Sequence, residues 1–338
     1  MEQSSYEFEL ERVAALVRER GATRVGLQLP DGLRSVAVSL ADEIAQETGA
    51  VVIISGNSCY GACDIDEKLA CMVELLFHFG HSSALFAQRR LRTPTGDTTT
   101  GLRPAETVIF IELRSTSDIK PVVEQAAAEI IGECVGLVAT VQHVHALEDA
   151  RAVLRHAGKA ATISKSLLVG AAPGLVLGCE FGAARAVPND EILFIGSGGF
   201  HPAGIALYTG KRVIAADPFT KQVHVFEPDE LRKKRYLVIA RALDAQTFGI
   251  LVGTKSGQCK LEDAVVMQRT AIAKGRNAYV IALDEICEAN LLGYAVDAFV
   301  NTACPRLVED LVAFKKPVLT IAEFEVVLGE RSWDELWQ

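Results

Sequence analysis

Residues 192–204, with the sequence ILFIGSGGFHPAG, join an apolar run to a glycine-rich turn and then to an Ala-, Ile- and Leu-rich stretch. A short run of consecutive apolar residues is typical of a strand that is buried on both faces, and such strands occur in parallel sheets. Glycines permit a tight turn, and a helix that follows it offers unpaired N–H groups at its start. This unit predicts an α/β protein built on parallel sheets.

Similar apolar runs follow one another along the whole chain and alternate with helix-like stretches such as 6–19 and 261–273. We expect strands at 24–29, 51–55, 75–79, 107–112, 136–140, 174–177, 192–195, 212–216, 248–252, 279–283, 298–301 and 318–321. The rhythm recurs three times, which predicts three similar domains, each a parallel sheet flanked by helices. We place them at 1–103, 104–220 and 221–338, with an exposed loop at 94–101.

Composition narrows the classes of function. The 338 residues carry 34 basic and 43 acidic side chains, a net charge of −9, which argues against nonspecific nucleic-acid binding and against a polybasic membrane surface. The longest uncharged stretches, 166–179 and 192–210, are broken by Gly and Pro, so neither is expected to span a membrane. Residues 1–20 lack the pattern of a secretory signal. We therefore expect a cytoplasmic protein with no membrane and no nucleic-acid partner.

Three of the eight cysteines stand beyond predicted strands at domain-sized spacing. They are Cys63, Cys179 and Cys304, which lie 116 and 125 residues apart. Loops beyond the carboxyl ends of parallel strands build the sites of α/β proteins, so three units that face one another would bring three thiols together. Cytoplasmic thiols stay reduced, and three soft ligands suit iron–sulfur chemistry.

The remaining cysteines and the histidines have weaker patterns. Cys59 and Cys63 begin a C-x-x-x-C-x-x-C signature, but Asp66 stands in its third position. The pairs His78-x-x-His81 and His143-x-His145 lack the further ligand of a catalytic zinc motif, so we expect hydrogen bonds within loops instead. Four cysteines without a repeated partner are expected to be structural: Cys71, Cys134, Cys259 and Cys287.

Together the motifs resemble those of the archaeal diphthamide-synthesis 3-amino-3-carboxypropyl transferases. The resemblance runs in order from about residue 26 to residue 324, and one departure is Leu175, where we expect Gln. The matching segments are Tyr60-Gly-Ala-Cys63-Asp, His78-Phe-Gly-His81, Gly174-Leu-Val-Leu-Gly-Cys179, Phe200-His-Pro, Gly253-Thr-Lys-Ser-Gly-Gln258 and Asn301-Thr-Ala-Cys304-Pro-Arg306.

The resemblance implies a homodimer in which Cys63, Cys179 and Cys304 of each chain hold one 4Fe–4S cluster. It implies a radical transfer of the 3-amino-3-carboxypropyl group from S-adenosylmethionine to C2 of a histidine imidazole in elongation factor 2, the first step of diphthamide synthesis. Three cysteines leave the fourth iron open to S-adenosylmethionine, and a separate electron donor reduces the cluster. No catalytic residue is expected beyond the cluster and its ligands.

Five residues that follow strand ends in the second and third domains are expected to line the S-adenosylmethionine pocket: Gly198, Gly199, His201, Lys255 and Arg306. Lys255 and Arg306 are the candidates for binding the methionine carboxylate, because a cation matches it. The turn around Lys255 is not a phosphate-binding P-loop, since G-x-x-x-x-G-K-[ST] is absent. Two alternatives stay open: a quinolinate-synthase-like 4Fe–4S dehydratase and a non-enzymatic electron-transfer protein.

Overall fold

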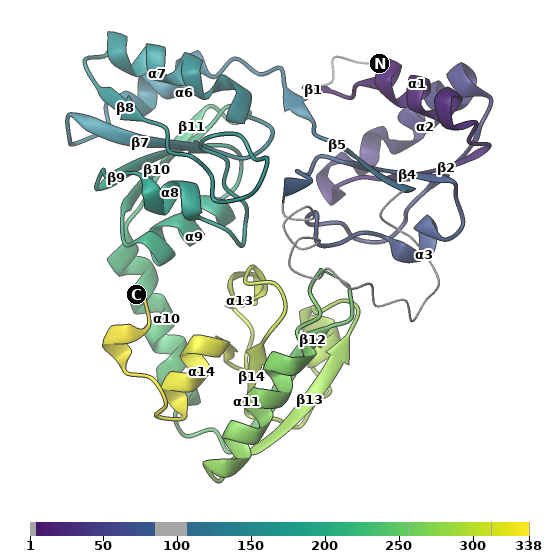
Figure 1. The fold of residues 1–338 in the computed structure, drawn as a ribbon. Coiled ribbons are helices and arrows are strands. Elements are labelled where there is room, and N and C mark those ends of the chain that lie inside the picture. The colour runs from purple at the N-terminus through teal and green to yellow at the C-terminus, as the bar shows by residue number, and fades with distance from the viewer. Residues whose placement is uncertain (1–4, 85–106, 256, 312, 338) are drawn as a thin grey trace.

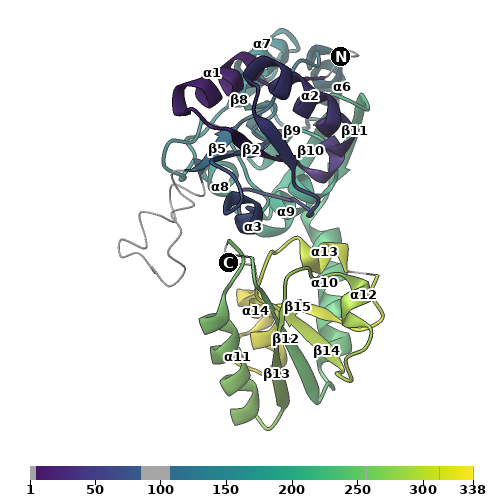
Figure 2. The ribbon, with the colours of Figure 1, turned by 90° about the vertical axis from the view of Figure 1, so that its right-hand side faces the viewer.

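Three sheets of mainly parallel strands, flanked by helices, follow one another along the chain. The computed structural model describes residues 5–84, 107–255, 257–311 and 313–337, so the loop expected at 94–101 lies outside the described residues. The third domain lies below the other two in both views (Figures 1 and 2). These sheets confirm the α/β prediction.

The first sheet has the order β3-β2-β4-β5 and is entirely parallel. Its strands are β2 (Arg24–Gln28), β3 (Val51–Ile54), β4 (Leu75–Phe79) and β5 (Val108–Ile111). Its helices are α1 (Leu10–Arg20), α2 (Ala37–Thr48) and α3 (Glu67–Ala70), with a 3₁₀ turn at Asp31–Val36. β5 pairs with β4 although it follows the predicted boundary at residue 103, so the first sheet extends to Ile111.

The second sheet has the order β11-β10-β9-β7-β8, and its edge strand β11 is antiparallel. The strands are β7 (Cys134–Ala139), β8 (Ala160–Thr162), β9 (Glu191–Ile195), β10 (Arg212–Asp217) and β11 (Gln222–Phe226). The helices are α6 (Lys120–Ala127), α7 (Leu147–His156), α8 (Gly182–Ala186) and α9 (Phe200–Thr209), with a 3₁₀ turn at Val144–Ala146. Because β11 pairs with β10, this sheet continues past the predicted boundary at residue 220.

The expected strand at 174–177 is wrong. The segment makes one parallel bridge, between Leu175 and Ala139, and then turns back through a bridge between Leu177 and Glu180. Gly174 has a φ of 78°, a left-handed conformation that interrupts an extended chain. The segment is therefore a buried loop that leads to Cys179.

The third sheet has the order β13-β12-β14-β15 and is entirely parallel. Its strands are β12 (Thr247–Gly253), β13 (Asn277–Leu283), β14 (Ala298–Asn301) and β15 (Val318–Thr320). The helices are α10 (Pro228–Ala242), α11 (Leu261–Ala273), α12 (Glu288–Leu291), α13 (Leu307–Asp310) and α14 (Ile321–Val327), with a 3₁₀ turn at Trp333–Glu335. The helix expected at 261–273 is confirmed.

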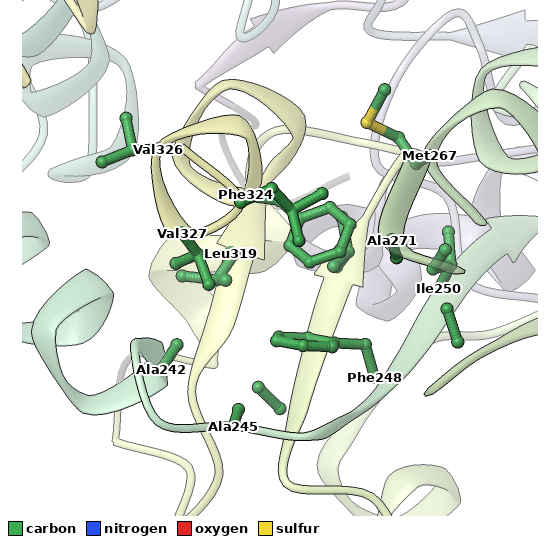
Figure 3. Close-up of a cluster of buried hydrophobic side chains, with 14 of the residues drawn as sticks. Ala242, Ala245, Phe248, Ile250, Met267, Ala271, Leu319, Phe324, Val326 and Val327 are labelled. Carbon is green, nitrogen blue, oxygen red and sulfur yellow. The ribbon is translucent and has the colours of Figure 1, made fainter. Parts of the chain in front are cut away.

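One face of the third sheet packs on α10, α11 and α14 around two aromatic rings in tilted contact. Phe248 and Phe324 are fully buried, with ring centroids 4.8 Å apart (Figure 3). α10 also packs on α9 of the second domain, so it joins the two domains. A short antiparallel pair, β1 (Tyr6–Glu7) with β6 (Arg114–Ser115), completes the fold. In the described part of the chain, no helix combines the length and the apolar character needed to cross a membrane.

Candidate metal centre

The loops of the three domains bring Cys63, Cys179 and Cys304 together. All eight cysteines are thiols in the structure. Burial raises the pKa of the Cys304 thiol to about 11, and the charges of Cys63 and Cys179 contribute to the rise. The three sulfurs are therefore within electrostatic reach of one another, although each comes from a different domain.

This donor set fits an iron–sulfur cluster. Thiolates are the soft ligands that such clusters use, and the thiols of three domains lie within electrostatic reach of one another here. Burial disfavours the Cys304 thiolate most, and repulsion from the charges of Cys63 and Cys179 adds to that cost and raises the pKa of Cys304. Bound iron offsets that repulsion, because metal binding displaces the thiol protons.

Lys255 forms an ion pair with Asp64, the residue that follows Cys63 in the chain. The Lys255 Nζ lies 2.9 Å from Asp64 Oδ1 and 3.0 Å from Oδ2, and both side chains are largely buried. Burial disfavours the charge on Lys255, but the Asp64 carboxylate outweighs it and raises the pKa of the ammonium group. Burial also raises the pKa of Asp64, and Lys255 offsets part of that rise. The predicted carboxylate-binding lysine thus already has an anionic partner.

Arg306 stands where all three domains meet. Its guanidinium carbon lies 4.9 Å from the ring centroid of Tyr60 in the first domain and 5.8 Å from that of Phe200 in the second. A planar guanidinium stacks favourably on aromatic rings, so these contacts hold its orientation. The Arg306 side chain therefore contacts both other domains.

A cavity of about 230 Å³ opens beside Arg306 and Cys304. Its walls include Tyr60, Lys255, Gln258 and Leu311. Pockets for drug-sized ligands measure roughly 300–1,000 Å³, so this cavity is matched to one part of such a ligand.

His201 is half-buried at the start of α9, and its ring stacks on Phe194 with centroids 5.8 Å apart. Burial lowers the pKa of His201 to about 4, and the charge of Arg306 contributes, so the ring is neutral at pH 7. The positions that side chains would take at Gly198 and Gly199 meet open space and Phe226, respectively. The structure therefore brings His201 close to Arg306. None of the three cysteines lies within 4 Å of the Cβ positions at Gly198 and Gly199.

A buried chain of hydrogen bonds lies behind the first-domain loop, and no sequence pattern points to its first member, Gln28. Gln28 Nε2 donates to the Asp64 carbonyl at 2.6 Å, so its Oε1 accepts from Asp66 N and from His78 Nδ1, the latter at 2.9 Å. Burial lowers the pKa of His78 well below its usual value, so the ring is neutral and its Nε2 accepts from His81 Nδ1 at 2.9 Å. The network therefore fixes both tautomers.

The expected hydrogen bonds form, but His78 makes its bond to Gln28 between strands β4 and β2 and not within a loop. Cys59 joins the same cluster, because its Sγ lies 4.0 Å from His81 Nδ1. The ligand atoms of the three residues lie within 4.8 Å of one another, a spacing compatible with a metal ion. Direct hydrogen bonding at 2.9 Å between the two rings accounts for their arrangement.

Comparisons with known proteins place this chain among proteins of one kind. A family model described as "Putative diphthamide synthesis protein" matches residues 29–338. The 2-(3-amino-3-carboxypropyl)histidine synthase of Pyrococcus horikoshii is 35% identical over 324 residues, which cover 94% of this chain and 90% of the relative. Subunit 1 of the same synthase from Gallus gallus is 32% identical, over 98% of this chain and 79% of the relative.

The fold has a solved counterpart. A crystal structure of Dph2 from Pyrococcus horikoshii with a 4Fe–4S cluster superposes with a TM-score of 0.82 and 33% sequence identity. The match covers 96% of this chain and 92% of the solved chain. The three-domain arrangement described above is therefore shared with a protein that holds such a cluster.

Proposed function

We propose that this chain, which belongs to the family of diphthamide synthesis proteins, transfers the 3-amino-3-carboxypropyl group of S-adenosylmethionine to C2 of a histidine imidazole in elongation factor 2. Its relatives at 35% and 32% identity are named 2-(3-amino-3-carboxypropyl)histidine synthases, and this chain is an enzyme of that class. The observation that carries the proposal is that three thiols, one from each domain, lie within electrostatic reach of one another.

Cys63, Cys179 and Cys304 would hold a 4Fe–4S cluster, the group that the solved relative contains. When bound, the cluster supplies an open iron and one electron, with which a sulfonium C–S bond is cleaved in a radical reaction. The further expectations are a homodimer, a cytoplasmic location and a separate electron donor.

The protein's own residues position the cosubstrate and shape its surroundings. Arg306, held by Tyr60 and Phe200, is oriented to bind the methionine carboxylate through charge-assisted hydrogen bonds. The neutral His201 adds no positive charge that would repel a sulfonium. Lys255 holds Asp64, so we assign it a positioning role in place of direct carboxylate binding.

The test is an anaerobic assay with dithionite, elongation factor 2 and S-adenosylmethionine labelled in the aminocarboxypropyl part. We expect label in elongation factor 2 and release of methylthioadenosine, and no label when the target histidine is replaced. Turnover of quinolinate precursors without labelled factor would support the dehydratase alternative. A cluster that cycles between redox states but never cleaves S-adenosylmethionine would support an electron-transfer protein.

Carboxylate binding is tested separately by calorimetry with S-adenosylmethionine. Arg306→Ala is expected to raise the dissociation constant by roughly tenfold or more, because the hydrogen bond to a charged group is lost. An unchanged dissociation constant would contradict the placement of the carboxylate at Arg306.

A further inference from the structure

We infer that Gln258 tunes the reduction potential of the cluster by donating a hydrogen bond to the Cys63 sulfur. Gln258 Nε2 lies 3.6 Å from Cys63 Sγ, a hydrogen-bond distance for sulfur. Gln258 belongs to the third domain and Cys63 to the first, so the contact forms only when the two domains are docked. The inference rests on the proposed function, because it requires a cluster at Cys63.

An ion pair ties Gln258 to the loop of Cys63. The backbone N–H of Gln258 donates to the Lys255 carbonyl at 2.8 Å, which closes a turn. The Lys255 ammonium group then binds the carboxylate of Asp64, the residue after Cys63, and only 13% and 4% of these two side chains are exposed. The turn that carries Gln258 is thus anchored next to the sulfur that its amide contacts.

Close packing restricts Gln258 further. A side chain at Gly257 would place its Cβ 2.5 Å from Cys63 Cβ, so the backbone here approaches Cys63 as closely as glycine allows. On the other side, the corresponding position at Gly253 lies 3.1 Å from Gln258 Cβ and 3.2 Å from Ala303 Cβ. Ala303 precedes Cys304. Gln258 therefore lies between the loop of Cys63 and the loop of Cys304.

The position of an amide N–H at a ligand sulfur has a defined electrostatic effect. Hydrogen bonds to the sulfurs are among the factors that set the potential of an iron–sulfur cluster. Reduction adds negative charge, which a donor stabilises, so Gln258 raises the potential. Its removal is expected to shift the reduction equilibrium toward the oxidised cluster by about tenfold, equivalent to about 59 mV for one electron.

The experiment is a potentiometric titration of the cluster-loaded protein, followed by electron paramagnetic resonance of the reduced cluster. Gln258→Leu removes the donor at similar volume and is expected to lower the potential by about 59 mV. Gln258→Glu replaces the donor with a negative charge and is expected to lower it further. Gln268→Leu is the matched control, because Gln268 Nε2 donates to the Ala278 carbonyl at 3.0 Å in the same domain. The reduction potential of the cluster in this variant should equal that of the wild type.

A second readout needs no cluster. In the metal-free protein, iodoacetamide is expected to modify Cys63 severalfold more slowly in Gln258→Leu, because the thiolate loses its donor. A reduction potential equal to that of the wild type in both Gln258 variants would overturn the inference. If the variants do not bind a cluster, an alkylation rate of Cys63 equal to that of the wild type would overturn it instead. A wild-type protein that never assembles a 4Fe–4S cluster would instead contradict the proposed function, so the two failures are distinguishable.

Discussion

Gly257→Ala is expected to separate Cys63 from the other two thiols. The added methyl carbon would lie 2.3 Å from the Cys63 carbonyl oxygen and 2.4 Å from its Cα, and both atoms belong to the backbone. Ordinary van der Waals contacts begin near 3.4 Å. One of the two loops must therefore move by about 1 Å, since neither clash is relieved by a side-chain rotation.

The size of that movement sets the expected loss. Overpacking of this kind costs about 1–3 kcal/mol, which a folded domain tolerates. A displacement of about 1 Å in a catalytic constellation lowers the rate by about 100-fold. We expect Gly257→Ala to fold, to contain less iron after anaerobic reconstitution, and to form methylthioadenosine about 100-fold more slowly.

Gly293→Ala is the matched control, because no atom lies within 4 Å of the position that its Cβ would take. It should retain iron and activity. Far-ultraviolet circular dichroism checks that both variants are folded. Iron content and activity in Gly257→Ala equal to those of Gly293→Ala would refute the argument that the third domain seats Cys63.

Two further predictions concern buried charges. Lys255→Met leaves the buried Asp64 carboxylate without its cation and should lower the free energy of unfolding by about 3–5 kcal/mol in urea titrations. The double variant Lys255→Met and Asp64→Asn should recover part of that loss. An unchanged free energy of unfolding in Lys255→Met would argue against the ion pair. The pKa values of His81, His143 and His201 are each lowered to about 4 by burial, so between pH 6.5 and 4 the unfolded chain binds protons that the native chain does not. Stability should therefore be complete above pH 6.5 and fall toward pH 4, whereas a flat profile would mean that these rings are protonated in the native state.

Local sequence patterns predicted most of the strands because a parallel strand is a short apolar run whatever surrounds it. The helix at 261–273 and the strand at 298–301 match the structure residue for residue. The pattern failed at 174–177, where Gly174 adopts a left-handed conformation. It also missed β11, whose exposed and half-buried residues at a sheet edge form no continuous apolar run.

The contacts around the candidate site were less accessible to sequence reasoning. Domain-sized spacing and a place beyond predicted strands single out Cys63, Cys179 and Cys304 as the predicted ligands. Lys255 looked like a carboxylate ligand because its partner Asp64 lies 191 residues away in the chain. The amides of Gln28 and Gln258 acquire their roles from tertiary neighbours, and no local pattern distinguishes such a glutamine from one on the surface.

The central claim is that one cysteine from each domain holds the cluster. Its most direct test is the iron content and visible thiolate-to-iron absorbance of anaerobically reconstituted Cys63→Ala, Cys179→Ala and Cys304→Ala. We expect each of the three to lose the 4Fe–4S signal, whereas Cys59→Ala, Cys71→Ala and Cys287→Ala retain it. A normal iron content and spectrum in any one of the first three variants would contradict the claim.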